Sequence, residues 1–256
     1  MSEGTEVRAM ILAAGRGERL RPLTETTPKP MVVVAGRPLI DFALDCVVRA
    51  GIGRVVLNLH HLGDQIRDYV GDGSRYGLAV DYSEEAVLQE TGGGIRDARP
   101  YLEGSTFVTL NADTIVDVDL RALVQTHREG GGLATMLLRK DPRMEKFGLV
   151  ETESDGRVGR FLGVPRPDHR PPLEPYMYTG VQVLGPRIFD YLRTEGPFSI
   201  TKISYPAMLA AGERVVGQAF DGAWITIGTP AELTAAKEFF DSGGHVGLFT
   251  TQSVER

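Results

Sequence analysis

The sequence has a single cysteine, Cys46, among its 256 residues. One thiol forms no internal disulfide framework and no thiolate metal cluster, and such sparse cysteine is typical of a reducing compartment. Long apolar runs are missing too, since no stretch approaches the roughly 18 apolar residues that a membrane-spanning helix needs. The first residues, MSEGTE, are acidic and unlike a secretory signal peptide. These features predict a cytoplasmic protein with no membrane partner.

An excess of positive charge is also absent. The chain has 28 lysines and arginines against 34 aspartates and glutamates, a formal net charge of −6. Bulk charge therefore argues against non-specific binding to nucleic acid, and any anion site must be local. The apolar fraction of 42% and the charged fraction of 24% are ordinary for a globular protein, and the length suits one large domain or two small ones.

Strand-like and helix-like segments alternate through the first half of the chain. The expected strands are residues 7–12, 54–59, 78–82 and 106–110, and the expected helices are residues 38–50, 64–70 and 94–101. Repetition of this kind predicts right-handed crossovers and an open parallel sheet with helices on both faces. Ligands bind such sheets at the carboxyl ends of the strands.

The second half is richer in strands. Strands are expected at residues 133–139, 148–151, 158–162 and 178–184, and helices at 186–194, 202–211 and 230–240. Residues 165–175 contain five prolines and predict an extended loop, and residues 243–256 predict a loose tail.

A loop rich in glycine, arginine and proline follows the first expected strand, in the stretch MILAAGRGERLRPLTETTPKP (residues 10–30). The glycines alone would suit a tight turn, but they also let a ligand approach the backbone. Four cations gather in this otherwise acidic chain: Arg16, Arg19, Arg21 and Lys29. Guanidinium groups match phosphate oxygens in bidentate geometry, so the loop predicts a polyphosphate site.

The stretch LAAGRGERLRPLT followed by TPKP resembles the signature of the sugar-1-phosphate nucleotidyltransferases, the nucleotide-sugar pyrophosphorylases. The resemblance covers about residues 7–240. It implies a three-layer, Rossmann-like α/β fold with a mixed, mainly parallel central sheet. It also implies a single domain at residues 1–242, with a nucleotide-binding half at about 7–130, a sugar-binding half at about 131–240, and the tail at 243–256.

The resemblance further implies that this loop wraps a nucleoside triphosphate, with Arg19 and Lys29 as catalytic residues on its phosphates. A second nucleotide-contacting stretch, ETGGGI, is expected just before a helix. The other implied nucleotide contacts are Leu12, Ala13, Ala14, Gly15 and Gly17 in the loop, and Gln89, Thr91, Gly92 and Gly93 around ETGGGI.

The stretch LNADTIVDVDL places Asn111 and Asp113 just past an apolar strand. A carboxylate there suits either Mg²⁺ or a capping Asx turn. The family pattern N-x-D implies that Asp113 is the metal ligand and a catalytic residue, with Mg²⁺ as the cofactor. Asp117 and Asp119 are expected to cap the following helix. Sugar contacts implied by the resemblance are Asn111, Gly148, Thr179 and Gly180.

Two motifs of the family are altered in this chain. The pattern W-x-D-x-G-T is present as WITIGT, with Thr226 in place of the aspartate. Loss of one aimed electrostatic contribution commonly costs about 10²–10³ in rate. Asp221 could compensate if its loop folds back. The lysine of an E-K-P motif is missing, and Arg160 is a loose substitute.

The resemblance implies the reaction sugar 1-phosphate + NTP → NDP-sugar + pyrophosphate. GERLRPLT, VAGRPLI, GDGSRYGL and ETGGGI are most similar to the N-acetylmuramate-1-phosphate uridylyltransferase group, which predicts UTP with an amino-sugar 1-phosphate such as N-acetylmuramate 1-phosphate. Mannose- or heptose-1-phosphate guanylyltransferase is the alternative. Because of Thr226, a catalytically weakened regulatory protein that binds nucleotide sugars is a third interpretation. A dinucleotide-dependent oxidoreductase fits poorly, because the glycine fingerprint is missing. Homo-oligomerisation is left open.

Overall fold

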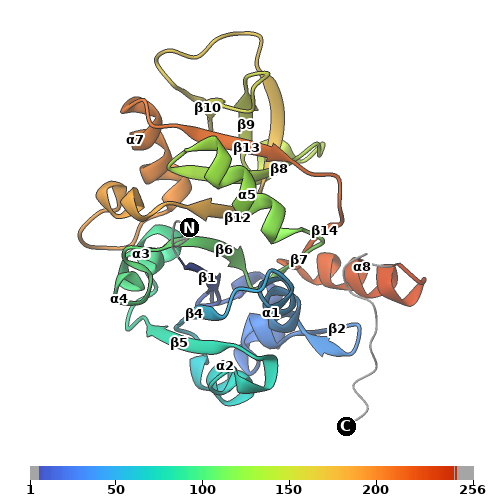
Figure 1. Cartoon of the computed structure of the whole chain (residues 1–256). Helices are drawn as coiled ribbons and strands as arrows, with labels where there is room; N and C mark the ends of the chain where they lie inside the picture. The colour runs from blue at the N-terminus through green and yellow to red at the C-terminus, as the bar shows by residue number, and fades with distance from the viewer. Residues whose placement is uncertain (1–5, 245, 247–256) are drawn as a thin grey trace.

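The computed structural model describes residues 6–244 and 246, and a ten-stranded mixed sheet runs through it (Figure 1). Four parallel strands of the first half have the order β6-β1-β4-β5, and β12 pairs antiparallel with β6 and connects them to the strands of the second half, where β8 and β13 are also parallel. The first-half strands are β1 (Val7–Leu12), β4 (Arg54–Leu59), β5 (Ala79–Glu84) and β6 (Thr106–Asn111). The second-half strands are β8 (Ala134–Arg139), β9 (Leu149–Thr152), β10 (Val158–Phe161), β11 (Val164–Pro165), β12 (Glu174–Leu184) and β13 (Val215–Ala219).

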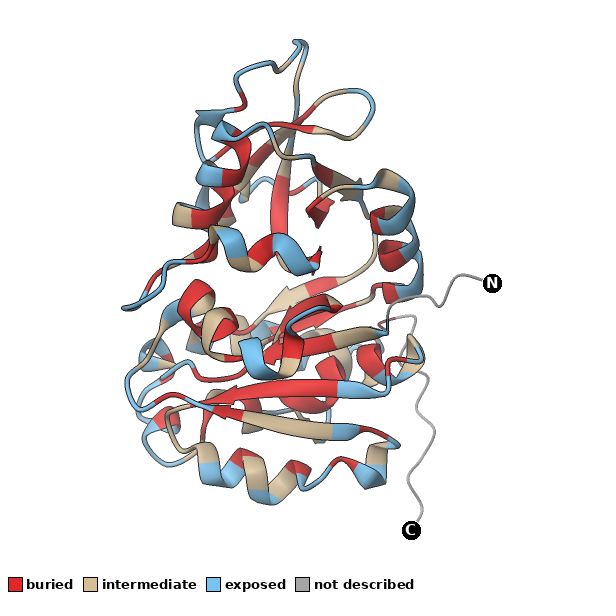
Figure 2. Cartoon of the chain, turned by 60° about the vertical axis from the view of Figure 1, so that its left-hand side comes forward, coloured by how far each residue is buried: buried red, intermediate tan, exposed pale blue. Residues whose placement is uncertain are grey.

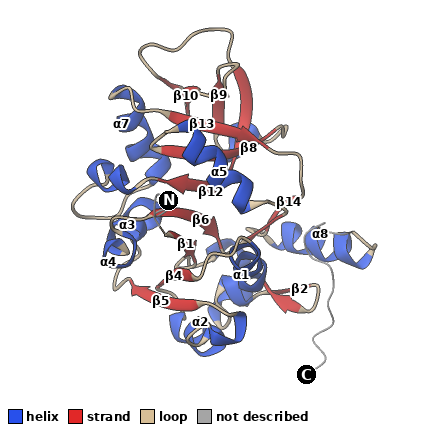
Figure 3. Cartoon of the chain, in the orientation of Figure 1, coloured by secondary structure: helices blue, strands red, loops and turns tan. Residues whose placement is uncertain are grey.

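Helices cover both faces of the sheet, as the alternation of segments predicts (Figure 3). Successive side chains of a strand point to opposite faces, so Met10 and Ile11 of β1 belong to two separate apolar clusters. One face carries α1 (Leu39–Arg49), α2 (Gly63–Val70) and α5 (Leu120–Gly130). The other carries α3 (Glu90–Asp97), α4 (Arg99–Leu102) and α7 (Tyr205–Ala210). In Figure 2 the strands between these layers are largely buried.

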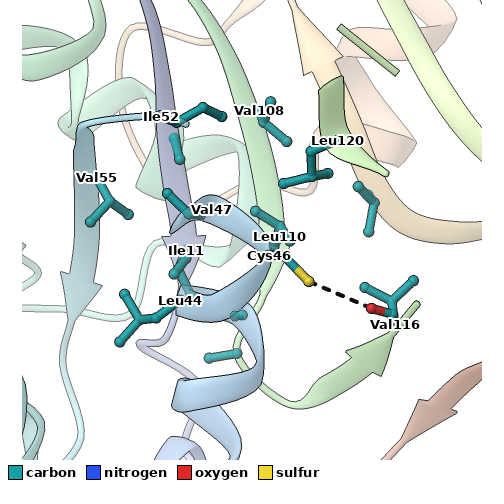
Figure 4. Packing of buried hydrophobic residues seen from close by; sticks show 14 of the residues in the cluster. Ile11, Leu44, Cys46, Val47, Ile52, Val55, Val108, Leu110, Val116 and Leu120 are labelled. Carbon is teal, nitrogen blue, oxygen red and sulfur yellow. Dashed lines mark hydrogen bonds between the residues drawn. The ribbon is translucent and has the colours of Figure 1, made fainter. Parts of the chain in front are cut away.

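Cys46 lies on the buried side of α1 and takes part in this packing (Figure 4). Its thiol donates to the carbonyl oxygen of Val116 at 3.5 Å. Burial raises the pKa of the thiol to about 11, so it stays protonated at neutral pH. Cys46 is therefore a packing residue, because a nucleophile requires the thiolate.

Two short ribbons lie outside the main sheet. One joins β2 (Val33–Val34) to β3 (Arg37–Pro38), and the other joins β7 (Thr114–Val116) to β14 (Trp224–Thr226). The helix α8 (Pro230–Asp241) and residues of both ribbons contribute to a third apolar cluster, which also includes Val246. The β7–β14 ribbon was not predicted, and it pairs Thr226 with Thr114, directly after Asp113.

The structure corrects several boundaries. ETGGGI forms the first turns of α3 instead of preceding a helix, and the Phe198 carbonyl accepts the backbone N–H of Gly92 in its first turn. The helix expected at 186–194 is a 3₁₀ helix, η5 (Pro186–Tyr191). The one expected at 202–211 is a π turn, η6 (Ile200–Ser204), followed by α7.

Other elements differ in length or were missed. The proline-rich loop is shorter than predicted, because β12 begins at Glu174. The strand β13 and the short helix α6 (Met144–Phe147) were not predicted. Asp119 caps α5 as expected, since its carboxylate accepts the backbone N–H groups of Arg121 and Ala122. Most of the expected tail lies outside the described residues. Within the described residues, no helix combines the length and apolarity needed to cross a membrane.

Candidate active site

An open pocket of about 230 Å³ lies at the carboxyl ends of β1 and β6. This is the edge where ligands bind in open α/β sheets. Both halves of the chain contribute to its wall, through α3, the loop after β6, β12 and β14. The predicted site residues that line it are Leu12, Thr91, Asn111, Asp113, Thr179 and Gly180.

The arginine-rich loop is built from short 3₁₀ turns, η1 (Glu18–Leu20), η2 (Leu23–Glu25) and η3 (Lys29–Met31). Gly17 has φ +62°, and a Cβ there would lie 2.9 Å from Thr24 Cγ2 and 3.2 Å from Lys29 Cβ. The Thr24 hydroxyl also donates to the Gly17 carbonyl at 2.8 Å. Glycine is therefore needed where the loop folds onto itself, and this fold presents Lys29.

Lys29 and Asp113 form an ion pair beside the pocket. The other oxygen of Asp113 accepts the Thr114 hydroxyl at 3.1 Å. The backbone N–H of Ile227 donates to the Asp113 carbonyl at 3.0 Å, so the WITIGT segment lies against this residue. The structure thus joins the first loop, the N-x-D stretch and the altered C-terminal motif.

The contact of Arg19 is with the segment after β14. A Cβ on Gly228 would lie 2.8 Å from Arg19 Nη2, so the guanidinium packs against the loop that follows β14. The glycine at this position leaves room for the arginine. Arg19, Gly15 and Gly17 do not line the pocket, and neither does Lys29.

A divalent metal has one carboxylate available here. No group of three or more His, Cys, Asp or Glu side chains that could hold a metal occurs in the described part of the chain. Asp113 and the neighbouring hydroxyls of Thr114 and Thr226 are hard oxygen donors. Mg²⁺ commonly takes one or two carboxylates and fills its other positions with water and substrate phosphates. The donor set therefore fits an ion that takes most of its ligands from a bound substrate and from water.

The ETGGG stretch is held by a segment of the second half. Gly92 and Gly93 donate their N–H groups to the Phe198 carbonyl at 2.9 and 3.3 Å. Thr91 Oγ1 accepts the N–H of Ile200 at 3.1 Å and still lines the pocket. The side chain of Gln89 does not line the pocket. Its amide oxygen accepts from Arg96 at 2.9 Å, and its amide nitrogen donates to the Val87 carbonyl at 2.9 Å. Of these four predicted residues, only Thr91 lines the pocket.

The predicted sugar contacts meet across β6 and β12. Gly180 has φ +90°, and a Cβ there would lie 2.4 Å from Asn111 Nδ2, so only glycine fits. The Thr179 hydroxyl donates to the Leu137 carbonyl at 2.8 Å, and the Thr179 backbone carbonyl accepts the Trp224 indole N–H at 2.9 Å. Gly148 does not line the pocket, and a Cβ there would lie 3.7 Å from both Phe161 and Tyr178.

Several pocket residues were not predicted, although Thr114 directly follows Asp113 in the LNADTIVDVDL stretch. They are Thr114, Phe147, Tyr178, Gln182, Ser199, Ile200 and Thr201. The Gln182 side chain accepts the hydroxyl of the buried Tyr205. Burial raises the pKa of Tyr178, so its phenol is neutral. The pocket therefore combines neutral hydroxyl and amide groups with aromatic rings, a lining suited to a sugar ring.

Neither suggested substitute for the altered motifs lines the pocket. Arg160 pairs with Glu151 at 3.0 Å on β9. Asp221 is also absent from the pocket wall. Thr226 lines the wall, as the position of its motif predicts.

Comparisons with known proteins agree with this architecture. Residues 8–243 match the family model described as nucleotidyl transferase. The chain is 39% identical over 239 residues to the N-acetylmuramate alpha-1-phosphate uridylyltransferase of Neisseria meningitidis serogroup B, covering 90% of this chain and 97% of that protein. It is 33% identical over 231 residues to the mannose-1-phosphate guanylyltransferase of Mycobacterium tuberculosis, covering 89% of this chain and 63% of that protein.

The chain spans 60% to 65% of the length of several other curated relatives. Among solved structures, a UDP-glucose pyrophosphorylase complexed with UDP-glucose matches with a TM-score of 0.77 at 17% identity, covering 92% of this chain and 98% of that one. This likeness supports the Rossmann-like fold. Since the family model spans nearly the whole chain, the resemblance in the sequence is confirmed, and the chain belongs to the nucleotidyl transferase family, whose matched relatives act on sugar 1-phosphates.

Proposed function

We propose that this chain transfers a nucleotidyl group from an NTP to a sugar 1-phosphate, releasing pyrophosphate. The observation that carries the proposal is the pocket itself. Its wall joins the end of β1, the N-x-D stretch and β12, and the Lys29–Asp113 pair stands beside it. A nucleotide on the first-half side and a sugar on the β12 side would meet at Asp113.

In this proposal a phosphate oxygen of the sugar 1-phosphate attacks the α-phosphorus of the NTP in line, and pyrophosphate leaves on the opposite side. Lys29 and Arg19 neutralise charge on the triphosphate, and the pocket holds the two reactants in contact. Asp113 would hold a divalent metal, proposed to be Mg²⁺, which supplies further charge neutralisation when bound. The reaction needs no covalent intermediate with the protein.

The proposed substrates are UTP and an amino-sugar 1-phosphate such as N-acetylmuramate 1-phosphate. The supporting observation is the match to the Neisseria uridylyltransferase, which is both the more identical of the two relatives and nearly equal in length. The match to the Mycobacterium guanylyltransferase makes GTP with mannose 1-phosphate the second candidate.

The test is pyrophosphate release from UTP, GTP, CTP or dTTP, each combined with N-acetylmuramate, mannose, glucose or heptose 1-phosphate. We expect the wild type to turn over UTP with N-acetylmuramate 1-phosphate. Thr226→Asp adds a carboxylate on the pocket wall and should raise the rate, by up to about 10²-fold. Thr226→Asn is the matched control, because asparagine has nearly the same shape as aspartate and adds no charge.

Three other outcomes are informative. Turnover with GTP and mannose 1-phosphate would replace the proposed substrates with the second pair. Activity in Thr226→Asp alone would favour a regulatory protein that binds nucleotide sugars. No turnover in any variant, with every pair tested, would refute the proposed reaction.

A further inference from the structure

A buried polar chain connects the two stretches proposed to contact the nucleotide. Asn58, at the end of β4, accepts the backbone N–H of Ala13 on its Oδ1 at 2.8 Å. Its Nδ2 donates to Glu85 Oε1 at 2.7 Å. The second carboxylate oxygen, Glu85 Oε2, accepts the backbone N–H of Gln89 at 2.8 Å. Three hydrogen bonds thus run from the arginine-rich loop to the start of α3.

The groups joined by these three hydrogen bonds are also closely packed. Asn58 and Glu85 are 3% and 5% exposed. A Cβ on Gly94 would lie 2.8 Å from both Asn58 Nδ2 and Glu85 Oε1, so α3 approaches these groups as closely as glycine allows. Such burial leaves no water to replace a lost partner, and an unpaired group there is costly.

The charges around Glu85 come from two other elements. Burial raises the pKa of Glu85, and the nearby carboxylate of Asp97 on α3 acts in the same direction. The hydrogen bonds from Gln89 and Asn58 oppose that rise, as does His60. His60 donates from Nδ1 to the Glu85 carbonyl oxygen at 2.8 Å, and its Nε2 lies 3.5 Å from Arg16 Nη2, which gives a second link to the first loop.

We propose that Asn58 and Glu85 are positioning residues that fix the spacing between the arginine-rich loop and the start of α3. The inference rests on the proposed function, since it assumes that both stretches bind one nucleotide. Neither side chain lines the pocket, so both act through Ala13 and Gln89. A nucleotide that spans the two stretches binds tightly only when their separation is held.

The direction of the hydrogen bonds gives a sharp test. Glu85→Gln replaces one acceptor with a donor, which leaves two donors facing each other. Asn58→Asp places two carboxylates in contact. In the double variant Asn58→Asp/Glu85→Gln the introduced aspartate accepts from Ala13 and from the introduced amide, whose oxygen accepts from Gln89. All three hydrogen bonds are then restored, with one reversed.

The measurement is titration calorimetry of UTP and of GTP, with thermal unfolding of each variant. We expect each single variant to weaken nucleotide binding by about tenfold, the effect of one lost buried hydrogen bond. The double variant should return to within about threefold of the wild type. Glu84→Gln is the control, because this neighbouring glutamate is exposed and pairs with Arg67 at the surface.

Gly94→Ala keeps the test open if a single variant does not fold. It crowds the side chains of Asn58 and Glu85 without removing a hydrogen-bonding group, and alanine favours the helix. It should also weaken nucleotide binding. Unchanged affinity in the folded single variants or in Gly94→Ala, or a double variant no better than the singles, would overturn the proposal. A wild type that binds neither nucleotide would instead refute the proposed function.

Discussion

At the scale of the residue, Lys29 and Asp113 have opposite charges and share one location. Gly17 and Thr24 fold the loop so that Lys29 reaches Asp113, which is half-buried at the pocket edge. Each charge offsets the other in the free protein. In the proposed reaction, Lys29 would turn to the phosphates and the Asp113 carboxylate would hold the metal. The pair therefore holds both groups ready without leaving a buried charge unpaired.

Changes to this pair should separate its two roles. Lys29→Met should lower kcat by about 10²-fold, since one aimed charge is lost. Asp113→Asn should lower kcat similarly and also raise the Mg²⁺ concentration needed for half-maximal rate. Initial rates measured across a range of MgCl₂ concentrations distinguish the two. Lys140→Met is a suitable control, because Lys140 pairs with Glu174 at the surface. Equal metal dependence in wild type and Asp113→Asn would count against Asp113 as the ligand.

At the scale of the element, the segment that runs from Gly196 into η6 is joined to α3. Arg96 donates to the Gly196 carbonyl at 2.8 Å and to the Gln89 side chain at 2.9 Å. The Phe198 carbonyl accepts from Gly92 and Gly93, and the Phe198 N–H donates to the Gln89 carbonyl at 3.1 Å. This part of the pocket wall is thereby attached to the first half, so binding of both proposed substrates would depend on this contact.

Gly92→Ala should break that attachment. The new Cβ would lie 2.2 Å from the Phe198 ring, so the segment must move even though alanine favours a helix. Overpacking of this kind destabilises by about 1–3 kcal/mol. We expect a lower Tm and higher KM values for both substrates. Adding Phe198→Leu makes room and should recover part of both losses; if it recovers neither, the contact does not carry the effect.

The sequence predicted elements better where local pattern decides the structure. Apolar runs in β1, β4 and β6 and the periodicity of α1 were sufficient for those elements. The three consecutive glycines of ETGGGI weaken any local helix signal, and Phe198, which is distant in the sequence, accepts the backbone N–H groups of Gly92 and Gly93 at this helix start. Likewise, the β7–β14 ribbon pairs segments far apart in the chain. Motif spacing predicted Asp113 and Thr179 at the pocket, but could not predict Gln182 or Ser199, which reach it only through the packing of β12 and η6.

At the scale of the whole molecule, the two halves share one sheet and meet at the pocket. The antiparallel pairing of β12 with β6 joins them, and the β7–β14 ribbon crosses back to the first half. The loop after β8 supports this crossing, because the Arg143 guanidinium lies 5.3 Å from the Trp224 ring centroid. Asp141 in turn fixes Arg143. The stability of the whole chain should therefore depend on the ionisation of Asp141.

The hydrogen bonds from Arg143, whose Nε and Nη2 each lie 2.8 Å from an Asp141 oxygen, lower the pKa of Asp141 from 3.8 to about 2. Because the pKa is lower in the folded state, this contribution to stability is fully present above pH 3.8 and is lost as the pH falls through 2. Asp141→Asn should thus lower the free energy of unfolding at pH 7. The difference from the wild type should shrink between about pH 4 and pH 2. Urea unfolding across this range measures it, with the exposed Asp190→Asn as control. A difference that stays constant over the range would assign the loss to packing instead of charge.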